Sequence, residues 1–231
     1  MTEVVLGIDT STRVAVGLAR DEQVLVSRLV GDTRSHVELL AGTIRDALAE
    51  AGLAWNDVTH LAVGVGPGPF TGLRVGIATA QTLGLALGLP VTGVCSLDVV
   101  ALRRADETAG RDGEFLAVLD ARRHEVYWAH YDGSGLRLAG PFVGPPAELP
   151  DLPVVGPGVA AHPELVVARG EVVDDCPLDA GLLAASLDRL PDVGLEPLYL
   201  RPPDAALPTG RKSAIAGGRL RLPLDNLGAV R

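Results

Sequence analysis

The sequence predicts an α/β protein of two similar lobes, and three observations lead to this prediction. The 231-residue chain opens with three short apolar runs, continues with alternating helical and strand-like segments, and then returns to its opening pattern. The first run, Val4–Ile8, ends at Asp9, and a similar run, Phe115–Leu119, ends at Asp120. The two aspartates lie 111 positions apart, so the pattern repeats once along the chain.

The first lobe is expected over residues 1–104. Apolar residues that alternate or run on predict strands, apolar residues at helical intervals predict helices, and Gly52 and Pro90 supply stops. Ser35 and Glu38 have the spacing of a capping box at the start of the first helix. Strands are expected at Val4–Ile8, Val14–Leu18, Val24–Val30, Leu61–Val65 and Val91–Val94. Helices are expected between them and after them, at Ser35–Ala51, Thr71–Gly88 and Leu97–Arg104.

The second lobe is expected over residues 105–203, with the polar residues 105–113 as a linker. Strands are expected at Phe115–Leu119 and Val126–Tyr131 and from Leu136, with shorter runs at Val154-Val155 and Val166-Val167 and a helix at Leu178–Leu190. Residues 204–231 are turn-rich and lack apolar periodicity, so we expect a mobile tail there.

The order of the expected elements indicates a duplicated ribonuclease-H-like fold. The chain begins with a meander of three strands, continues with alternating helices and strands, and then repeats its opening pattern. This is the architecture of the actin, Hsp70 and sugar-kinase (ASKHA) group, in which two lobes face each other across a cleft. The turns after the first strand of each lobe point into that cleft, and Asp9 and Asp120 fit these places. Fold alone does not give function.

Two interpretations of these turns stay open. Asp9, Thr10, Ser11 and Asp120 have the side chains of a phosphate or metal turn, because hydroxyls and backbone N–H groups face anions and carboxylates hold cations. The alternative is an ordinary Asx turn at a strand end. Active kinases of this fold usually place glycines here, and this chain does not. We therefore interpret the four residues as vestigial phosphate turns.

A glycine-rich segment joins the fifth predicted element to the next helix. It contains no G-K-[ST], so it is not a P-loop, and Pro67 and Pro69 remove two N–H donors. The helix that follows has small residues every four positions, at Gly72, Gly76, Ala80, Gly84 and Gly88. Each interior glycine costs about 0.8–1 kcal/mol relative to alanine, so the stripe requires a reason. We predict that it faces a partner; the alternative is packing within this chain.

Composition restricts the function further. The net charge of -9 does not attract a phosphate backbone, so any nucleic acid would be contacted mainly by another protein. The sequence has no secretory leader and no run apolar enough to span a membrane, which predicts a cytoplasmic protein without membrane contact. Without a metal-ligand motif or a nucleophile elbow, no metal and no catalytic residue are expected.

Four segments together resemble one family. They are LGIDTST, VGVGPGPFTGLRVGIATAQTLG, LDARRHEVYWAHY and EPLYLR, and RSHVELL matches the usual helix start of the same family. This is the TsaB (YeaZ) family, and the resemblance covers Val4 to about Arg201. Two departures are that Pro69 stands where the family often has serine, and that the H-x-x-x-H metal pair of the catalytic paralogue is absent.

The resemblance implies a non-catalytic subunit required for threonylcarbamoyl transfer to the adenosine beside the anticodon of ANN-reading tRNAs. Its implied partners are TsaD, a paralogue that holds the metal and the catalytic site, and TsaE, a small ATPase. The tRNA is then reached only through the complex, and no cofactor belongs to this chain itself. Whether a nucleotide binds at the interface within the complex, and whether the isolated chain forms a homodimer, stay open.

The resemblance also implies a partner interface on the first two helices. Its residues are Ser35, His36, Leu39, Leu40, Phe70, Thr71, Gly72, Arg74, Gly76, Ala80 and Gly84. The alternative function is a stand-alone ATP-dependent kinase of the actin-like fold. A metalloprotease is a third alternative, and the missing ligand pair argues against it.

Overall fold

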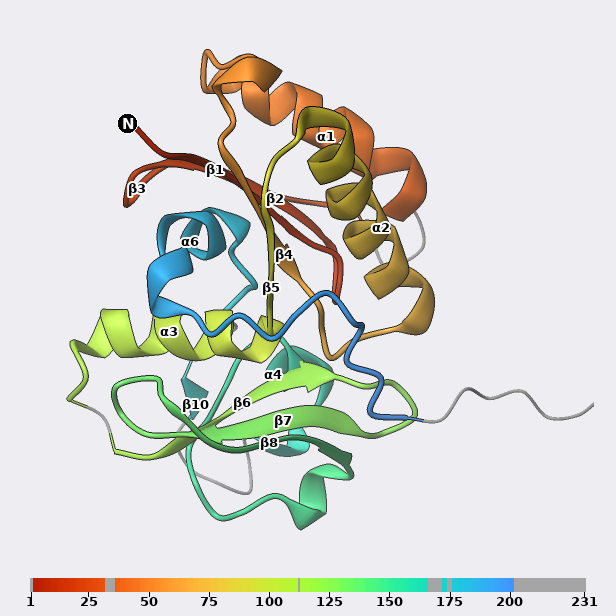
Figure 1. The fold of residues 1–231 in the computed structure, drawn as a ribbon. Coiled ribbons are helices and arrows are strands. Elements are labelled where there is room, and N and C mark those ends of the chain that lie inside the picture. Colours follow the sequence, from red (N-terminus) through yellow and green to blue (C-terminus); the bar gives the residue numbers. More distant parts are fainter. Residues whose placement is uncertain (1, 32–35, 112, 166–171, 174–175, 202–231) are drawn as a thin grey trace, which may run out of the picture.

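Two five-stranded sheets form the framework of the protein (Figure 1). The computed structural model describes residues 2–31, 36–111, 113–165, 172–173 and 176–201. The first sheet has the spatial order β3-β2-β1-β4-β5, with β1 at Val4–Asp9, β2 at Val14–Arg20, β3 at Gln23–Val30, β4 at His60–Gly64 and β5 at Val91–Val94. The second has the order β10-β9-β6-β7-β8, with β6 at Phe115–Asp120, β7 at Val126–Tyr131, β8 at Arg137–Gly144, β9 at Val154–Val155 and β10 at Val172–Val173.

The two sheets have the same topology. In the first, β1 pairs antiparallel with β2 and parallel with β4; in the second, β6 pairs antiparallel with β7 and parallel with β9. Asp9 lies opposite Ala15 and Asp120 lies opposite Val126, which is the same register shifted by 111 residues. The predicted duplication of a ribonuclease-H-like lobe is therefore confirmed.

Helices cover both faces of the first sheet. Alternate residues of a strand point to opposite faces. Leu6 and Ile8 of β1 belong to the core beneath α1 (His36–Glu50) and α2 (Phe70–Leu87), whereas Val5 belongs to the core beneath α6 (Ala180–Ala185). Short elements complete the chain: the helix α4 at Gly158–Ala161 and single 3₁₀ turns at Trp55–Asp57, Pro146–Glu148 and Leu187–Arg189.

Helix α3 (Ser96–Thr108) and helix α6 join the two lobes. Leu97 and Val100 of α3 pack into the core of the second sheet, while Val99 and Leu102 pack with Val5 and α6 against the first. Helix α6 follows the second sheet in sequence but lies directly on the first, where a Cβ at Gly17 would overlap with its backbone. The core of each sheet thus includes residues from the other half of the chain; α3 lies between the two sheets (Figure 1).

Two predicted helix boundaries are wrong. Helix α3 continues to Thr108, so the predicted linker 105–113 begins inside a helix, as does the predicted lobe boundary at residue 104. The polar residues there form the solvent face of a helical turn: Arg103 pairs with Glu107, and Ala105 is buried. Conversely, the helix expected at Leu178–Leu190 is only α6, because Ser186 leaves the helical conformation at φ -126° and ψ 27°.

Some predictions fall on residues outside the described part of the chain. These are the capping role of Ser35, the run Val166-Val167 and the tail at 204–231. Among the helices that the structure describes, none is long and apolar enough to cross a membrane.

The glycine stripe of α2 faces this chain's own sheet. Gly72, Gly76, Ala80 and Gly84 are buried. A Cβ at Gly76 would overlap with the hydroxyl of Thr10, which directly follows β1, and one at Gly84 would overlap with Val91 on β5. The prediction of a partner-facing stripe is therefore wrong at these positions, because the close approach that needs glycine is between helix and sheet. Gly88 is instead the exposed left-handed cap of the helix, at φ 67°.

This packing predicts opposite effects for two glycine substitutions. Gly76→Ala should lower the free energy of unfolding by about 1–3 kcal/mol, since overpacking outweighs the helix propensity of alanine. Gly42→Ala in α1, where a Cβ would meet nothing within 4 Å, should raise it by up to about 1 kcal/mol. Urea denaturation of both variants measures the difference. Equal stabilisation by the two changes would contradict the observed packing of α2.

Candidate functional site

Asp9 ends β1 and is wholly buried at the centre of the molecule. Its Oδ1 accepts a hydrogen bond from the Ser11 N–H at 2.7 Å, and its Oδ2 accepts one from the Ser96 hydroxyl at 2.6 Å. The Ser96 hydroxyl also accepts from the Gly66 N–H at 3.2 Å. A Cβ at Gly64 would overlap with the Asp9 carboxylate. Asp9 therefore ties together the end of β1, the turn before α2 and the start of α3.

The neighbouring residues of this turn also point inward. Thr10 is wholly buried; its hydroxyl donates to the Gly72 carbonyl at 2.8 Å and accepts from the Gly76 N–H at 3.1 Å. Ser11 is 2% exposed. The first turn therefore anchors α2 and α3, and a ligand in the cleft would reach the Asp9 carboxylate and the Thr10 hydroxyl only after rearrangement.

Asp120 makes the same turn in the second lobe, and its side chain is accessible. Its Oδ1 accepts from the Arg122 N–H at 2.8 Å, as Asp9 accepts from Ser11. Both aspartates thus form the Asx turn that the sequence left as an alternative. The Asp120 side chain is 27% exposed, and its carboxylate lies 3.6 Å from Arg122 Nε and 3.4 Å from His162 Nε2.

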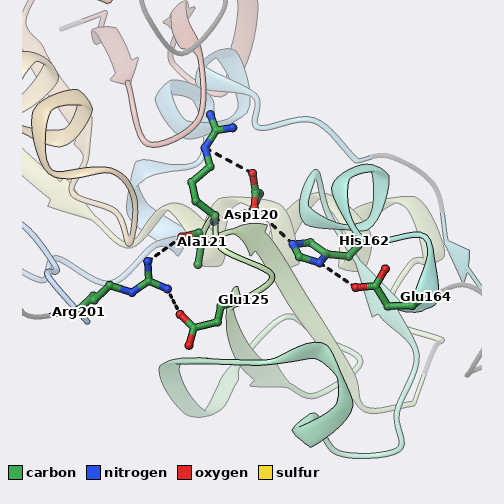
Figure 2. Close-up of polar contacts among 7 residues, drawn as sticks. Asp120, Ala121, Glu125, His162, Glu164 and Arg201 are labelled. Carbon is green, nitrogen blue, oxygen red and sulfur yellow. Dashed lines mark hydrogen bonds and ion pairs between the residues drawn. The ribbon is translucent and has the colours of Figure 1, made fainter. Parts of the chain in front are cut away.

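His162 connects this turn to the segment after α4, and sequence reasoning missed it. Its ring is 5% exposed, and Nδ1 lies 3.0 Å from Glu164 Oε1, so the ring bridges two carboxylates (Figure 2). The pKa of Glu164 lies below its ordinary value, first because the carboxylate accepts from its own backbone N–H and second because of the bond to His162. His162 stands in a Pro- and Gly-rich stretch without helical or strand periodicity, so no sequence signal marked it.

The turn from β6 to β7 has an unusual backbone. Arg122, Arg123 and His124 have φ values of 63°, 56° and 61°. Left-handed conformations cost L-residues roughly 1–2 kcal/mol each, and non-glycine residues rarely occupy three in succession. All three side chains are exposed, so core packing does not account for the strain. Strain of this kind is a reason to look for function.

These arginines line a groove between the β6–β7 turn and the C-terminal strap, residues 197–201. This arginine groove has a volume of about 280 Å³. It is lined by Gly68, Pro69, Phe70, Ala121, Arg122, Arg123, Tyr127, Tyr199, Leu200 and Arg201. A second groove of about 420 Å³ lies between the lobes and contains Ser11, Arg13 and Asp120; the two share Pro69 and Arg122. The two grooves are therefore neighbours that meet at these two residues.

Stacked side chains hold the strap to α2. The Arg74 guanidinium lies 3.7 Å from the centroid of the Phe70 ring, and Arg74 Nε donates to the Tyr199 hydroxyl at 2.8 Å. The Phe70 and Tyr199 rings stack with centroids 4.9 Å apart. Arg201 donates to the Ala121 carbonyl at 3.2 Å and forms an ion pair with Glu125 (Figure 2). The groove wall is thereby fixed at both ends.

Other candidate chemistry is limited. Cys95 is wholly buried, and burial first and the Asp98 charge second raise the pKa of its thiol to about 12, so it is protonated at neutral pH. Within the described ranges, no three His, Cys, Asp or Glu side chains gather closely enough to hold a metal ion.

Two duplicated sheets facing a cleft, each with an Asx turn after its first strand, define a protein of the actin, Hsp70 and sugar-kinase class. A family model described as "TsaD: tRNA N6-adenosine threonylcarbamoyltransferase" matches residues 32–172, more than half of the chain. The protein named "tRNA threonylcarbamoyladenosine biosynthesis protein TsaB" of Escherichia coli (strain K12) is 31% identical over 209 residues, 81% of this chain and 84% of that protein. The chain belongs to the TsaB (YeaZ) family.

Two further comparisons agree with this membership. "Uncharacterized protein ML0378" of Mycobacterium leprae (strain TN) is 44% identical over 229 residues, which is 94% of this chain; the chain spans 60% of the length of that relative. The solved structure entitled "YeaZ from Pseudomonas aeruginosa" superposes with a TM-score of 0.66 at 28% identity, over 86% of this chain and 100% of that one. The fold of the family thus extends over most of the chain.

The Asp9 hydrogen bonds predict the effect of removing the Ser96 hydroxyl. Ser96→Ala should lower the free energy of unfolding by about 1.5–3 kcal/mol, because a buried carboxylate loses a donor. Ser134→Ala is a matched control, since its hydroxyl donates to Asp132 at 2.6 Å in an exposed turn where water can replace it; about 0.5 kcal/mol or less is expected. Urea denaturation checks both, and equal losses would show that the buried Ser96–Asp9 hydrogen bond stabilises the fold no more than the exposed Ser134–Asp132 one.

Proposed function

We propose that this chain works in the biosynthesis of N6-threonylcarbamoyladenosine in tRNA, as a non-catalytic subunit that supports a TsaD-like catalytic partner. The likeness to the E. coli protein named TsaB, which extends over 81% of this chain, carries the first part of the proposal. The family model described as a threonylcarbamoyltransferase fits a chain that is related to the catalytic subunit.

The state of Asp9 supports the non-catalytic part. A kinase or a transferase of this fold needs cleft carboxylates that can reach a cation or a phosphate-bound metal. Here the Asp9 carboxylate is wholly buried and receives hydrogen bonds from Ser11 and Ser96. This geometry opposes the alternative of a stand-alone ATP-dependent kinase, because freeing Asp9 would break the anchor of α2 and α3.

The outer face of α1 and α2 is the surface that we assign to the partner. With the glycine stripe turned inward, α2 presents Phe70, Arg74, Ala78, Gln81 and Leu85 on one exposed stripe at helical spacing. Leu85 is 88% exposed and Phe70 is 46% exposed, which makes them the large apolar side chains most open to a partner on this helix. Ala41 and Ala49 of α1 are exposed as well, and small residues let a helix approach closely.

Of the interface residues expected from the sequence, Phe70, Thr71 and Arg74 are exposed and remain part of this proposal. Leu40 is 2% exposed and belongs to the core, and Leu39 packs partly against it. The position of Ser35 and the side chain of His36 lie outside what the structure describes. The proposed roles of TsaE and of tRNA contact through the complex rest on the family resemblance.

Leu85→Glu should separate folding from assembly. The free energy of unfolding should change by no more than about 0.5 kcal/mol, because the side chain is in water in the free chain. Capture of a co-expressed TsaD-like protein should fall at least about tenfold, because a charge would be buried at the interface. Pull-down measures capture, and complementation of a strain depleted of its own TsaB measures tRNA modification.

Leu136→Glu serves as the control, since Leu136 is 61% exposed but lies beside β8 in the other lobe. It should leave both folding and capture unchanged. Normal capture by Leu85→Glu would remove α2 from the proposed interface. Failure of the unaltered chain to capture a TsaD-like protein or to complement would overturn the proposed function itself.

A further inference from the structure

The arginine groove concentrates positive charge on an acidic protein. The chain has 29 Asp and Glu residues against 20 Lys and Arg. Arg122, Arg123 and Arg201 all line the groove, and among the described residues that line it none is acidic. Asp120 and Glu125 pair with Arg122 and Arg201 from outside the lining, which orients these two guanidinium groups and offsets part of their charge. Such a local excess of arginine suits an anionic ligand, and phosphate in particular.

Aromatic rings stand opposite these arginines. Phe70 is 46% exposed and Tyr199 is 38% exposed, and both line the groove with Tyr127. The Arg74 contacts hold the two stacked rings in place before any ligand arrives. Exposed rings beside arginine are the combination that binds unpaired bases, because every base has a π-face and every nucleotide has a phosphate.

The size and position of the groove favour a single nucleotide of a nucleic-acid chain. Its volume of about 280 Å³ lies just below the range of about 300–1,000 Å³ typical of small-molecule pockets. It adjoins the second groove, which contains Arg13, at Pro69 and Arg122.

We propose that the arginine groove binds one nucleotide of a single-stranded RNA, with its base on the Tyr199 ring and its phosphate on Arg122 and Arg123. The inference rests on the proposed function, which supplies RNA as the substrate class. The left-handed β6–β7 turn then has a purpose: it directs adjacent arginine side chains toward the groove. Contact with RNA is weak in the free chain, whose overall charge is unfavourable, and the complex supplies the rest.

The test uses the full free chain, so it does not depend on any partner. Chemical-shift titrations at about 50 mM salt, where phosphate contacts are strong, compare an RNA hexanucleotide with AMP, adenosine and inorganic phosphate. The double variant Arg122→Asn, Arg123→Asn removes both guanidinium groups while keeping a residue that tolerates left-handed backbone. The charge-matched control is Arg20→Asn with Arg45→Gln, two exposed arginines outside the groove.

We expect the hexanucleotide to bind more tightly than AMP, and the double groove variant to weaken it about tenfold or more. The slope of log K against log salt should fall by about 0.7 for each phosphate contact removed. The control variant should change affinity less than twofold. Tyr199→Ala should weaken binding about tenfold, and Tyr199→Phe, which keeps the ring, should restore it. Melting temperatures establish that each variant is folded.

The other outcomes overturn the proposal in distinguishable ways. If AMP binds as tightly as the hexanucleotide, the ligand is a free mononucleotide and not an RNA strand. If inorganic phosphate competes equally well, the proposed stacking of a base is wrong. Equal losses in the groove and control variants would reduce the effect to general charge. The titration contains no TsaD-like protein, so a negative result contradicts RNA binding by the groove without contradicting partner capture. Failed capture contradicts the proposed function, and the titration can still be interpreted.

Discussion

The hydrogen bond between the buried Asp9 carboxylate and the Ser96 hydroxyl is the contact on which the rest of the structure depends. A carboxylate withdrawn from water must receive donors, and here they come from the turn after β1 and from the start of α3. Space for the carboxylate requires glycine at position 64, and the Gly66 N–H completes the arrangement. Thr10, next in the chain, fixes α2 to β1 by two further hydrogen bonds. One turn thus positions three elements.

The lobes are separate in sequence but not in packing. Helix α3 ends the first half of the chain yet contributes Leu97 and Val100 to the second core, and α6 ends the second half yet covers the first sheet. Neither sheet has a complete core without residues from the other half. A boundary drawn from polar composition therefore cannot separate units that fold alone, and loss of one lobe should expose the apolar face of the other.

The sequence was sufficient for the strands and for the repeat, because apolar runs ending in aspartate keep the same spacing in both halves. It was insufficient where one pattern has two physical causes. A stripe of small residues on α2 fits a partner helix or a sheet equally well, and only the position of Thr10 and Val91 decides. The arginine groove was not predicted. Arg122, Arg123 and Tyr199 lie in segments that match the family, but they come together only through the left-handed backbone of the β6–β7 turn and the path of the C-terminal strap. His162 had no periodic neighbours to mark it.

The two hydrogen bonds between the Thr10 hydroxyl and the backbone of α2 have a consequence for the proposed assembly. The backbone of the first turns of α2 is hydrogen-bonded to the turn after β1, which opposes sliding or rotation of the helix, so its outer stripe is ordered in the free chain. Binding then loses little conformational entropy on this side, and affinity can come from few contacts. The glycines that seat α2 so closely on the sheet therefore keep the opposite face of the helix rigid, and at the proposed interface the free chain would already have the shape that a partner meets.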